Sequence, residues 1–130
     1  DAASAAVAQE ESARTALVAI LDRQGLSPVG VSELASEAGV SADVARKVLT
    51  LLALDKTVVR ISSEMHFMRS TIAAARATLT AHIEAHGPSS AADLRDALGV
   101  SRKYAIPLLE YFDAQGLTRR EGDLRVLRKA

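Results

Sequence analysis

The sequence predicts a mainly α-helical fold with small β-hairpins, built as two tandem units. Its 130 residues are 48% hydrophobic but only 3% aromatic, and the apolar residues are mostly Ala, Leu and Val, which favours helices over a β-sandwich. Each half of the chain shows three helical apolar patterns followed by two β-prone runs around a short turn. The two halves also resemble each other, which indicates a duplicated unit.

The internal repeat has a constant offset of sixty residues over its central part. The matching residues of the first copy are Leu34, Gly39, Val40, Ser41, Ala45 and Leu49, and those of the second are Leu94, Gly99, Val100, Ser101, Ala105 and Leu109. Near the hairpins the offset slips by one, so that residues 67–69 match residues 126–128. Two copies are too few for a solenoid, so we expect two domains, residues 1–69 and 70–130, joined by a short link at residues 69–71.

In the first copy we expect a helix that ends at Gly25, a second helix from a Ser32 cap to Gly39, and a third helix capped by Ser41. The predicted inward residues are Leu17, Ile20 and Leu21 of the first helix and Val44, Val48, Leu51 and Leu52 of the third. Residues 58–61 and 65–68 are β-prone and flank a short turn, which predicts a hairpin.

The second copy repeats this plan. Its first helix is expected from about residue 70 to residue 86, with Leu79 and Ile83 inward, and Ser90 with Asp93 forms a capping-box pattern for the next helix. Ser101 is expected to cap the third helix, which Gly116 ends; its inward residues should be Ala105, Leu108, Leu109 and Phe112. A hairpin should turn at residues 121–123. Three helices and a two-stranded hairpin form a winged helix-turn-helix.

Pro107 lies inside the third helix of the second copy, where it removes the hydrogen bond to the carbonyl of Lys103. We expect an irregular first turn in this helix, which would aim Arg102 and Lys103 outward.

Charge is distributed unevenly although the formal net charge is zero. Residues 1–68 carry six Lys and Arg against nine Asp and Glu, whereas residues 69–130 carry ten against seven. Cysteine is absent, which fits a reducing, cytoplasmic compartment. No stretch has the roughly 18 apolar residues of a membrane span, and the start at Asp1 without a signal-peptide pattern suggests a fragment of a longer protein.

The start of the third helix differs in charge between the copies. The first copy has Ser41-Ala42-Asp43-Val44, whereas the second has Ser101-Arg102-Lys103-Tyr104. Cations at a helix N-terminus oppose the helix dipole by about 0.3–1 kcal/mol each, so their presence suggests a function. A phosphate at this helix end would gain from the side chains and from free backbone N–H groups.

The second hairpin is basic as well, with Arg119, Arg120 and Arg125 beside the acidic Glu121 and Asp123. We interpret these arginines as a second group of phosphate contacts. The alternative is a solvated face in which the two acidic residues are local partners.

Tyr104 and Arg95 each allow two interpretations. Tyr104 either stacks on an extruded RNA base or packs against Leu108 one turn later in the helix. Arg95 either reaches a phosphate or pairs along the surface of its own helix.

No set of residues suggests catalysis, a metal ion or a cofactor. His82 and His86 are spaced i, i+4, but no third ligand is evident and no Glu follows the first histidine as in a zinc-peptidase motif. We therefore expect neither an enzyme nor a metal site, and interpret both histidines as helix-end surface residues.

Residues 98–113 and 118–127 resemble the C-terminus of the bacterial selenocysteine-specific elongation factor family, SelB. The resemblance is specific over roughly residues 88–128 and weaker over residues 10–68. It implies that the chain corresponds to the third and fourth of four winged helices, the last of which binds the selenocysteine insertion hairpin (SECIS) of the messenger RNA. It also implies that Arg102, Lys103, Arg119, Arg120 and Arg125, with Tyr104, face the RNA. GTPase and tRNA-binding domains would belong to the remainder of the factor.

We therefore predict an RNA-binding module that grips an mRNA stem-loop through its second domain, with Arg95, Ser101, Arg102, Lys103, Tyr104, Arg119, Arg120 and Arg125 as the contact residues. The acidic first domain suggests a spacer or a contact with the ribosome. Two alternatives stay open: a DNA-binding regulator that inserts its third helix into the major groove, and a protein-interaction scaffold.

Overall fold

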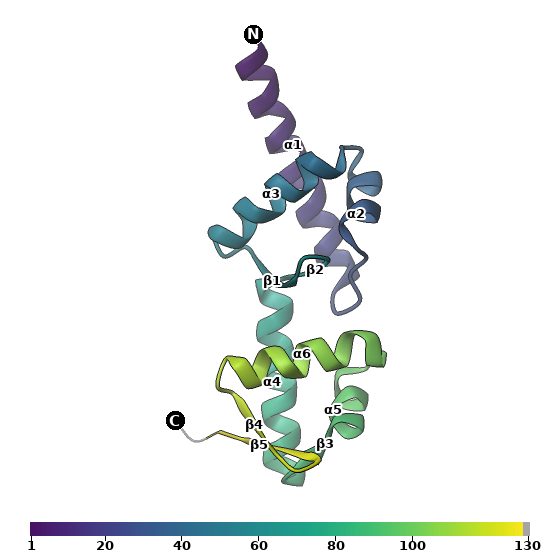
Figure 1. The fold of residues 1–130 in the computed structure, drawn as a ribbon, viewed down its shortest axis with the longest axis vertical. Coiled ribbons are helices and arrows are strands. Elements are labelled where there is room, and N and C mark those ends of the chain that lie inside the picture. Colours follow the sequence, from purple (N-terminus) through teal and green to yellow (C-terminus); the bar gives the residue numbers. More distant parts are fainter. Residues whose placement is uncertain (129–130) are drawn as a thin grey trace. The chain divides into compact units, whose positions relative to one another are not determined.

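The computed structural model describes residues 1–128, which form two compact units (Figure 1). The first unit comprises residues 1–71, and the second begins at Ile72. Unit 1 contains α1 (Ala2–Gln24), α2 (Val31–Ala38), α3 (Ala42–Leu54), β1 (Val58–Ser62) and β2 (Met65–Met68). Unit 2 contains α4 (Arg69–His86), which starts within unit 1, β3 (Ser89–Ser90), α5 (Ala91–Leu98), α6 (Arg102–Ala114), β4 (Thr118–Glu121) and β5 (Leu124–Leu127). Residues 69–71, which we expected to link the domains, form the first turn of α4.

The helices α1, α2 and α3 of unit 1 pack on one another around a core of aliphatic side chains. On α3 the buried residues are Ala45, Val48, Leu49 and Leu52. Leu51, which we predicted to point inward, is 43% exposed, because the spacing i, i+3, i+4, i+7 from Ala45 leaves position 51 outside the buried stripe.

The start of α2 is held by a distant residue rather than by a local cap. Gly30, not Ser32, is the N-cap, and no side chain of its own segment caps the helix. The Val31 N–H donates to a carboxylate oxygen of Glu64 at 3.3 Å. Since Glu64 lies in the β1–β2 turn, 33 residues away, the sequence next to α2 carried no sign of this cap.

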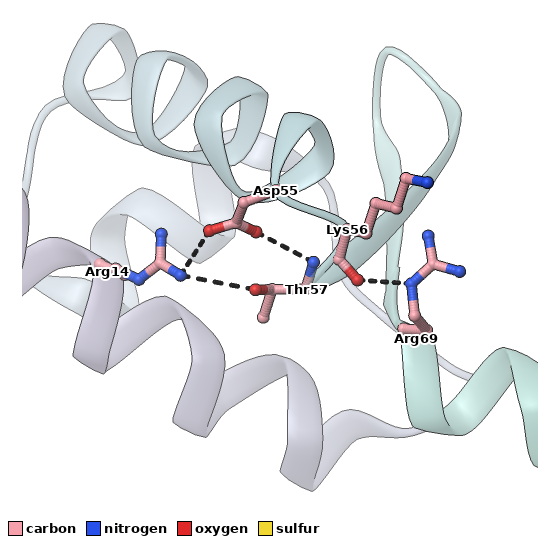
Figure 2. A network of polar contacts seen from close by, with 5 residues as sticks. All are labelled: Arg14, Asp55, Lys56, Thr57 and Arg69. Carbon is pink, nitrogen blue, oxygen red and sulfur yellow. Dashed lines mark hydrogen bonds and ion pairs between the residues drawn. The ribbon is translucent and has the colours of Figure 1, made fainter.

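The start of the unit 1 hairpin is anchored to α1 and α4 by polar contacts (Figure 2). Arg14 Nη2 on α1 lies 2.6 Å from the Asp55 carboxylate, which also accepts the Thr57 N–H at 3.0 Å. Hydrogen bonds from Thr57 and from Arg14 lower the pKa of Asp55 to about 2. Arg69 at the start of α4 donates through Nε to the carbonyl oxygen of Lys56, which adopts a left-handed φ of 68°. These contacts fix the turn between α3 and β1.

Unit 2 follows the predicted plan and adds one strand. Its core contains the predicted inward residues Leu79, Ile83, Ala105, Leu108, Leu109 and Phe112. Strand β3 pairs with β5, so the sheet has three strands in the order β3-β5-β4. A two-residue strand has too little pattern to be recognised from sequence, and Ser89 and Ser90 were predicted only as a helix cap.

The predicted turns and caps of unit 2 are mostly present. The Ser90 hydroxyl accepts the Asp93 N–H at 3.1 Å. Gly99 ends α5 with a left-handed φ of 71°, and Gly122 turns the hairpin with a φ of 63°; both conformations favour glycine. Ser101 is the N-cap of α6, but its side chain makes no capping hydrogen bond.

Helix α6 is continuous through Pro107, so the irregular first turn that we expected is absent. The Ala105 N–H donates to the Ser101 carbonyl at 3.0 Å, as in a regular α-helix. Proline removes only the bond to the carbonyl of Lys103, and that residue is exposed, so water is available to its carbonyl. The orientation of Arg102 and Lys103 therefore does not depend on a distorted helix.

The one-residue slip of the internal repeat has a structural cause. In unit 1 the pairing of β1 with β2 shifts register between Arg60 and Ser62, which leaves Ile61 as an extra residue in a β-bulge. The pairing of β4 with β5 has no such shift. Consequently β1 matches β4 at an offset of sixty up to the bulge, and β2 matches β5 at fifty-nine.

Candidate nucleic-acid interface

The first turn of α6 presents two cations and no acidic residue. Both Arg102 and Lys103 are exposed. The equivalent turn of α3 contains Asp43 and is capped by the Ser41 hydroxyl, which accepts the Val44 N–H at 3.2 Å. At α6 the Ser101 hydroxyl makes no such bond, and the Tyr104 N–H donates instead to the Ser101 carbonyl at 3.1 Å. The hydroxyl, the backbone amides of Arg102 and Lys103 and both cations are available to an anion.

A small hollow of about 110 Å³ lies between α5 and α6, beside these cations. Its lining residues are Ala91, Ala92, Arg95, Arg102, Ala105 and Ile106. The structure thus brings Arg95 and Arg102, from different helices, to the same hollow. Arg95 also lies 3.3 Å from the Asp96 carboxylate with its side chain 38% exposed, so the pairing along its own helix is present, and its contact with a phosphate stays a prediction.

Tyr104 is half-buried, and the ammonium group of Lys103 lies 5.3 Å from the centre of its ring. This distance is within the range of a cation–π interaction. The contact holds the two side chains together at the helix start, and base stacking by Tyr104 stays a prediction.

Two of the three predicted wing arginines are exposed. Arg119 pairs with Glu121 on the same strand, and its side chain remains 60% exposed. Arg120 is exposed as well, and no hydrogen bond or ion pair of its side chain occurs within residues 1–128. The local pairing that we kept as an alternative therefore exists for Arg119 but not for Arg120.

Arg125 is buried, which corrects its predicted place on the surface. Only 5% of the residue is exposed. Its Nε lies 3.1 and 3.2 Å from the two carboxylate oxygens of Asp113 on α6, and its Nη2 lies 2.9 Å from Oδ2. The Thr118 hydroxyl donates to the same carboxylate at 2.6 Å. Since Asp113 neutralises the guanidinium inside the unit, Arg125 is not available to a ligand in this structure.

His82 and His86 lie side by side near the end of α4. The rings of His82 and His86 lie 4.5 Å apart and are tilted at 40°, and among residues 1–128 no group of three or more potential ligands occurs. Within the same residues no helix is long and apolar enough to cross a membrane.

The surface of unit 1 differs from that of unit 2. Its hollow of about 150 Å³ lies between α3 and the hairpin and includes Arg46, Arg60 and His66. Arg46 is 3.6 Å from Glu64. Burial lowers the pKa of His66 to about 4, and the positive charge of Arg60 adds to the effect while Glu64 opposes it. His66 is therefore neutral at pH 7, and α3 lacks the cationic first turn of α6.

Two winged helix-turn-helix units in tandem, the second with a cationic helix start and an exposed basic wing, define the class of nucleic-acid-binding winged-helix proteins.

Comparison with known proteins identifies one family. The family model described as "Elongation factor SelB, winged helix" matches residues 81–127. The selenocysteine-specific elongation factor of Escherichia coli is 36% identical over 106 residues, which is 82% of this chain and 17% of that protein. That of Desulfomicrobium baculatum is 28% identical over 116 residues, 89% of this chain and 18% of that protein.

Solved structures agree with the sequence comparison. The chain is 32% identical to the mRNA-binding domain of SelB from E. coli, a structure determined in complex with SECIS RNA, with a TM-score of 0.77 over 90% of this chain and 98% of that one. A bacterial selenocysteine-specific elongation factor matches with a TM-score of 0.71 at 28% identity. The chain belongs to the SelB family. It spans about one sixth of the length of the curated relatives. The assignment of its two units as the third and fourth winged helices stays a prediction, because the matching family model is named for the third winged helix but falls on the second unit of this chain.

Proposed function

We propose that this chain is the mRNA-hairpin-binding module of a selenocysteine-specific translation elongation factor, and that unit 2 binds the SECIS stem-loop. The observation that carries the proposal is the cluster of exposed cations on unit 2. Arg102 and Lys103 stand at an uncapped helix start, and Arg119 and Arg120 lie on the adjacent wing. The similar domain of E. coli is described in complex with the same class of RNA.

The geometry suits a hairpin rather than a continuous duplex. The major groove of A-form RNA is too deep and narrow for side chains to read, so proteins recognise RNA hairpins by phosphates and by extruded bases. The start of α6 and the wing would hold phosphates near the loop. The hollow between α5 and α6 has an apolar floor and two arginines, a chemistry that suits the face and edge of one extruded base.

The DNA-binding alternative requires base-reading side chains along the middle of the third helix. On α6 these positions hold Ile106 and Pro107, both half-buried, and the exposed Glu110. Neither an aliphatic side chain nor proline donates hydrogen bonds to base edges, and a carboxylate repels phosphate. These residues therefore favour RNA over DNA.

The wider role follows from the family. The GTPase and tRNA-binding domains would lie in the remainder of the factor, the first domain would serve as a spacer or face the ribosome, and the site of action would be the cytoplasm. The chain is a winged-helix module rather than a catalytic domain, and we infer that it performs no reaction of its own.

The test is the affinity of the chain for a SECIS hairpin, a scrambled RNA hairpin and a DNA duplex of equal length, each at two salt concentrations. Selective binding of the SECIS hairpin that weakens steeply with salt is the expected result, since phosphate contacts release counterions. Equal binding to all three nucleic acids would reduce the proposal to a generic basic surface. Binding to none would favour the protein scaffold.

A further inference from the structure

Three polar side chains of unit 2 attach both strands of the wing to the end of α6. Asp113 extends from α6, Thr118 begins β4 and Arg125 lies in β5. Thr118 and Arg125 are buried, at 2% and 5% exposure, and both donate hydrogen bonds to the Asp113 carboxylate. One carboxylate, 24% exposed, thus joins both strands to the helix, and the Thr118 and Arg125 side chains are too buried to touch RNA.

Unit 1 lacks this arrangement at the same three positions. With the offsets set by the β-bulge, Asp113 corresponds to Ala53, Thr118 to Val58 and Arg125 to His66. His66 is also buried, yet its Nδ1 has no hydrogen-bond partner among residues 1–128. The buried ion pair therefore occurs in the unit with the cationic helix start, and unit 1 forms its hairpin without it.

A buried ion pair adds little net stability, because desolvation of both charges offsets their attraction; its better-attested use is to select one arrangement among several. Here the arrangement that the ion pair selects is the position of the strand that carries the exposed arginines. Arg125 lies directly opposite Arg120 in the β4–β5 ladder, and Arg119 precedes Arg120. Fixing Arg125 to α6 therefore fixes the strand that carries both exposed arginines.

We propose that Asp113 and Arg125 are positioning residues that hold the wing at one distance from α6, so that Arg119 and Arg120 contact the same hairpin as Arg102 and Lys103. The inference rests on the proposed RNA-binding function. It changes the role of Arg125 from a phosphate contact to a support for two other contacts.

The substitution Asp113→Asn distinguishes an Arg125 that binds phosphate from an Arg125 that positions the wing. The two roles predict opposite changes in affinity for the SECIS hairpin. The substitution raises the net charge by one and leaves Arg125 in place without its ionic partner. If Arg125 bound phosphate directly, its release would maintain or increase the affinity for the SECIS hairpin. If the pair positions the wing, affinity falls about tenfold at 0.15 M salt and the slope of log K against log salt becomes shallower by about 1.4–1.8, because two phosphate contacts are lost.

Arg119→Met is the matched control, because it removes an exposed arginine from the same wing. It should make the salt slope shallower by only about 0.7–0.9 and leave the wing amides protected from hydrogen exchange. Asp113→Asn should instead accelerate exchange of the β4 and β5 amides, while far-UV circular dichroism shows that both variants are folded. Equal or tighter hairpin binding by folded Asp113→Asn would overturn the proposal.

A second variant covers the case in which Asp113→Asn fails to fold. Thr118→Val removes only the hydroxyl contact and leaves the ion pair intact; we expect faster exchange in β4 and about threefold weaker binding, and no change in either would contradict the proposal. If the unaltered chain does not bind the hairpin, the proposed function fails. Hydrogen exchange of Asp113→Asn, which uses no RNA, then decides separately whether Asp113 holds the wing. Unchanged protection of the β4 and β5 amides would refute that role.

Discussion

Replacing Arg102 and Lys103 with alanine should weaken RNA binding without lowering stability. Both residues are exposed in the first turn of α6, which contains no acidic residue. Each cation opposes the helix dipole by about 0.3–1 kcal/mol. With the lower value, appropriate to exposed groups in salt, removing both cations relieves about 0.6 kcal/mol of unfavourable interaction with the dipole. Loss of the cation–π contact between Lys103 and Tyr104 costs about 0.5 kcal/mol at an exposed site. The two effects nearly cancel, so the Tm of unit 2 should stay unchanged or rise by no more than about 1 °C.

The same substitution should weaken binding of the SECIS hairpin. Loss of two phosphate contacts makes the slope of log K against log salt shallower by about 1.8 if the contacts are on a duplex, or about 1.4 on a single strand. Fluorescence anisotropy with a labelled hairpin at four salt concentrations measures the slope, and differential scanning calorimetry measures Tm. Weaker binding at an unchanged or slightly higher Tm requires that the two cations serve a ligand rather than the stability of the helix.

The control is Arg76→Ala, which removes an exposed arginine from α4. It should leave the salt slope nearly unchanged, since this residue is outside the proposed interface. Unaltered affinity of the Arg102 and Lys103 double variant would remove the helix start from the interface. An equal loss in the control would show that only net charge matters.

Three further predictions concern buried residues and one turn. Because the pKa of His66 is about 4 in the fold and near 6.5 in the unfolded chain, the unfolded chain binds more protons between these values, so stability should fall as pH decreases from 6.5 to 4. Thermal denaturation at pH 7 and pH 5 should show that His66→Gln flattens this decline; an unchanged pH profile would contradict it. Leu108→Ala, at a fully buried position, should cost about 2–5 kcal/mol in urea denaturation, whereas Leu54→Ala, at 74% exposure, should stay within about 0.5 kcal/mol. Gly99→Ala should cost about 1–2 kcal/mol, because only the left-handed backbone opposes the new methyl group and no other atom lies within 4 Å of it; a smaller cost would show that the α5–α6 turn can relax.

The sequence was sufficient for the elements whose signals are local. Helical periodicity identified Ala105, Leu108, Leu109 and Phe112 as the buried face of α6, and the repeat showed that unit 1 has the same plan. The errors at the α2 cap and at β3 occurred where a second element decides the outcome. Ser32 was predicted as a cap, yet the start of α2 is held by Glu64 from the hairpin. The strand β3 exists only because β5 offers it a partner.

The candidate site shows the same contrast between local signals and contacts made by a second element. Comparing the two helix starts was enough to single out Arg102 and Lys103, because the exposure of a first helical turn follows from local structure. Arg125 was misplaced, since a basic residue in a hairpin is usually at the surface. Its burial depends on Asp113 of α6, twelve residues earlier in the chain. An Asp near the end of the third helix and an inward-facing Arg on the wing form a pattern that could have suggested the pair.

The amino-acid sequence by itself determined the two winged-helix units, their helices and hairpins, and the concentration of positive charge in the second unit, because periodicity, caps and charge are properties of neighbouring residues. Only the tertiary structure decided which arginines of the wing face solvent. Arg119 and Arg120 remain exposed, while Arg125 is buried and paired with the Asp113 carboxylate. A buried guanidinium requires a partner that compensates for its desolvation. Asp113 becomes that partner only when β5 packs against α6.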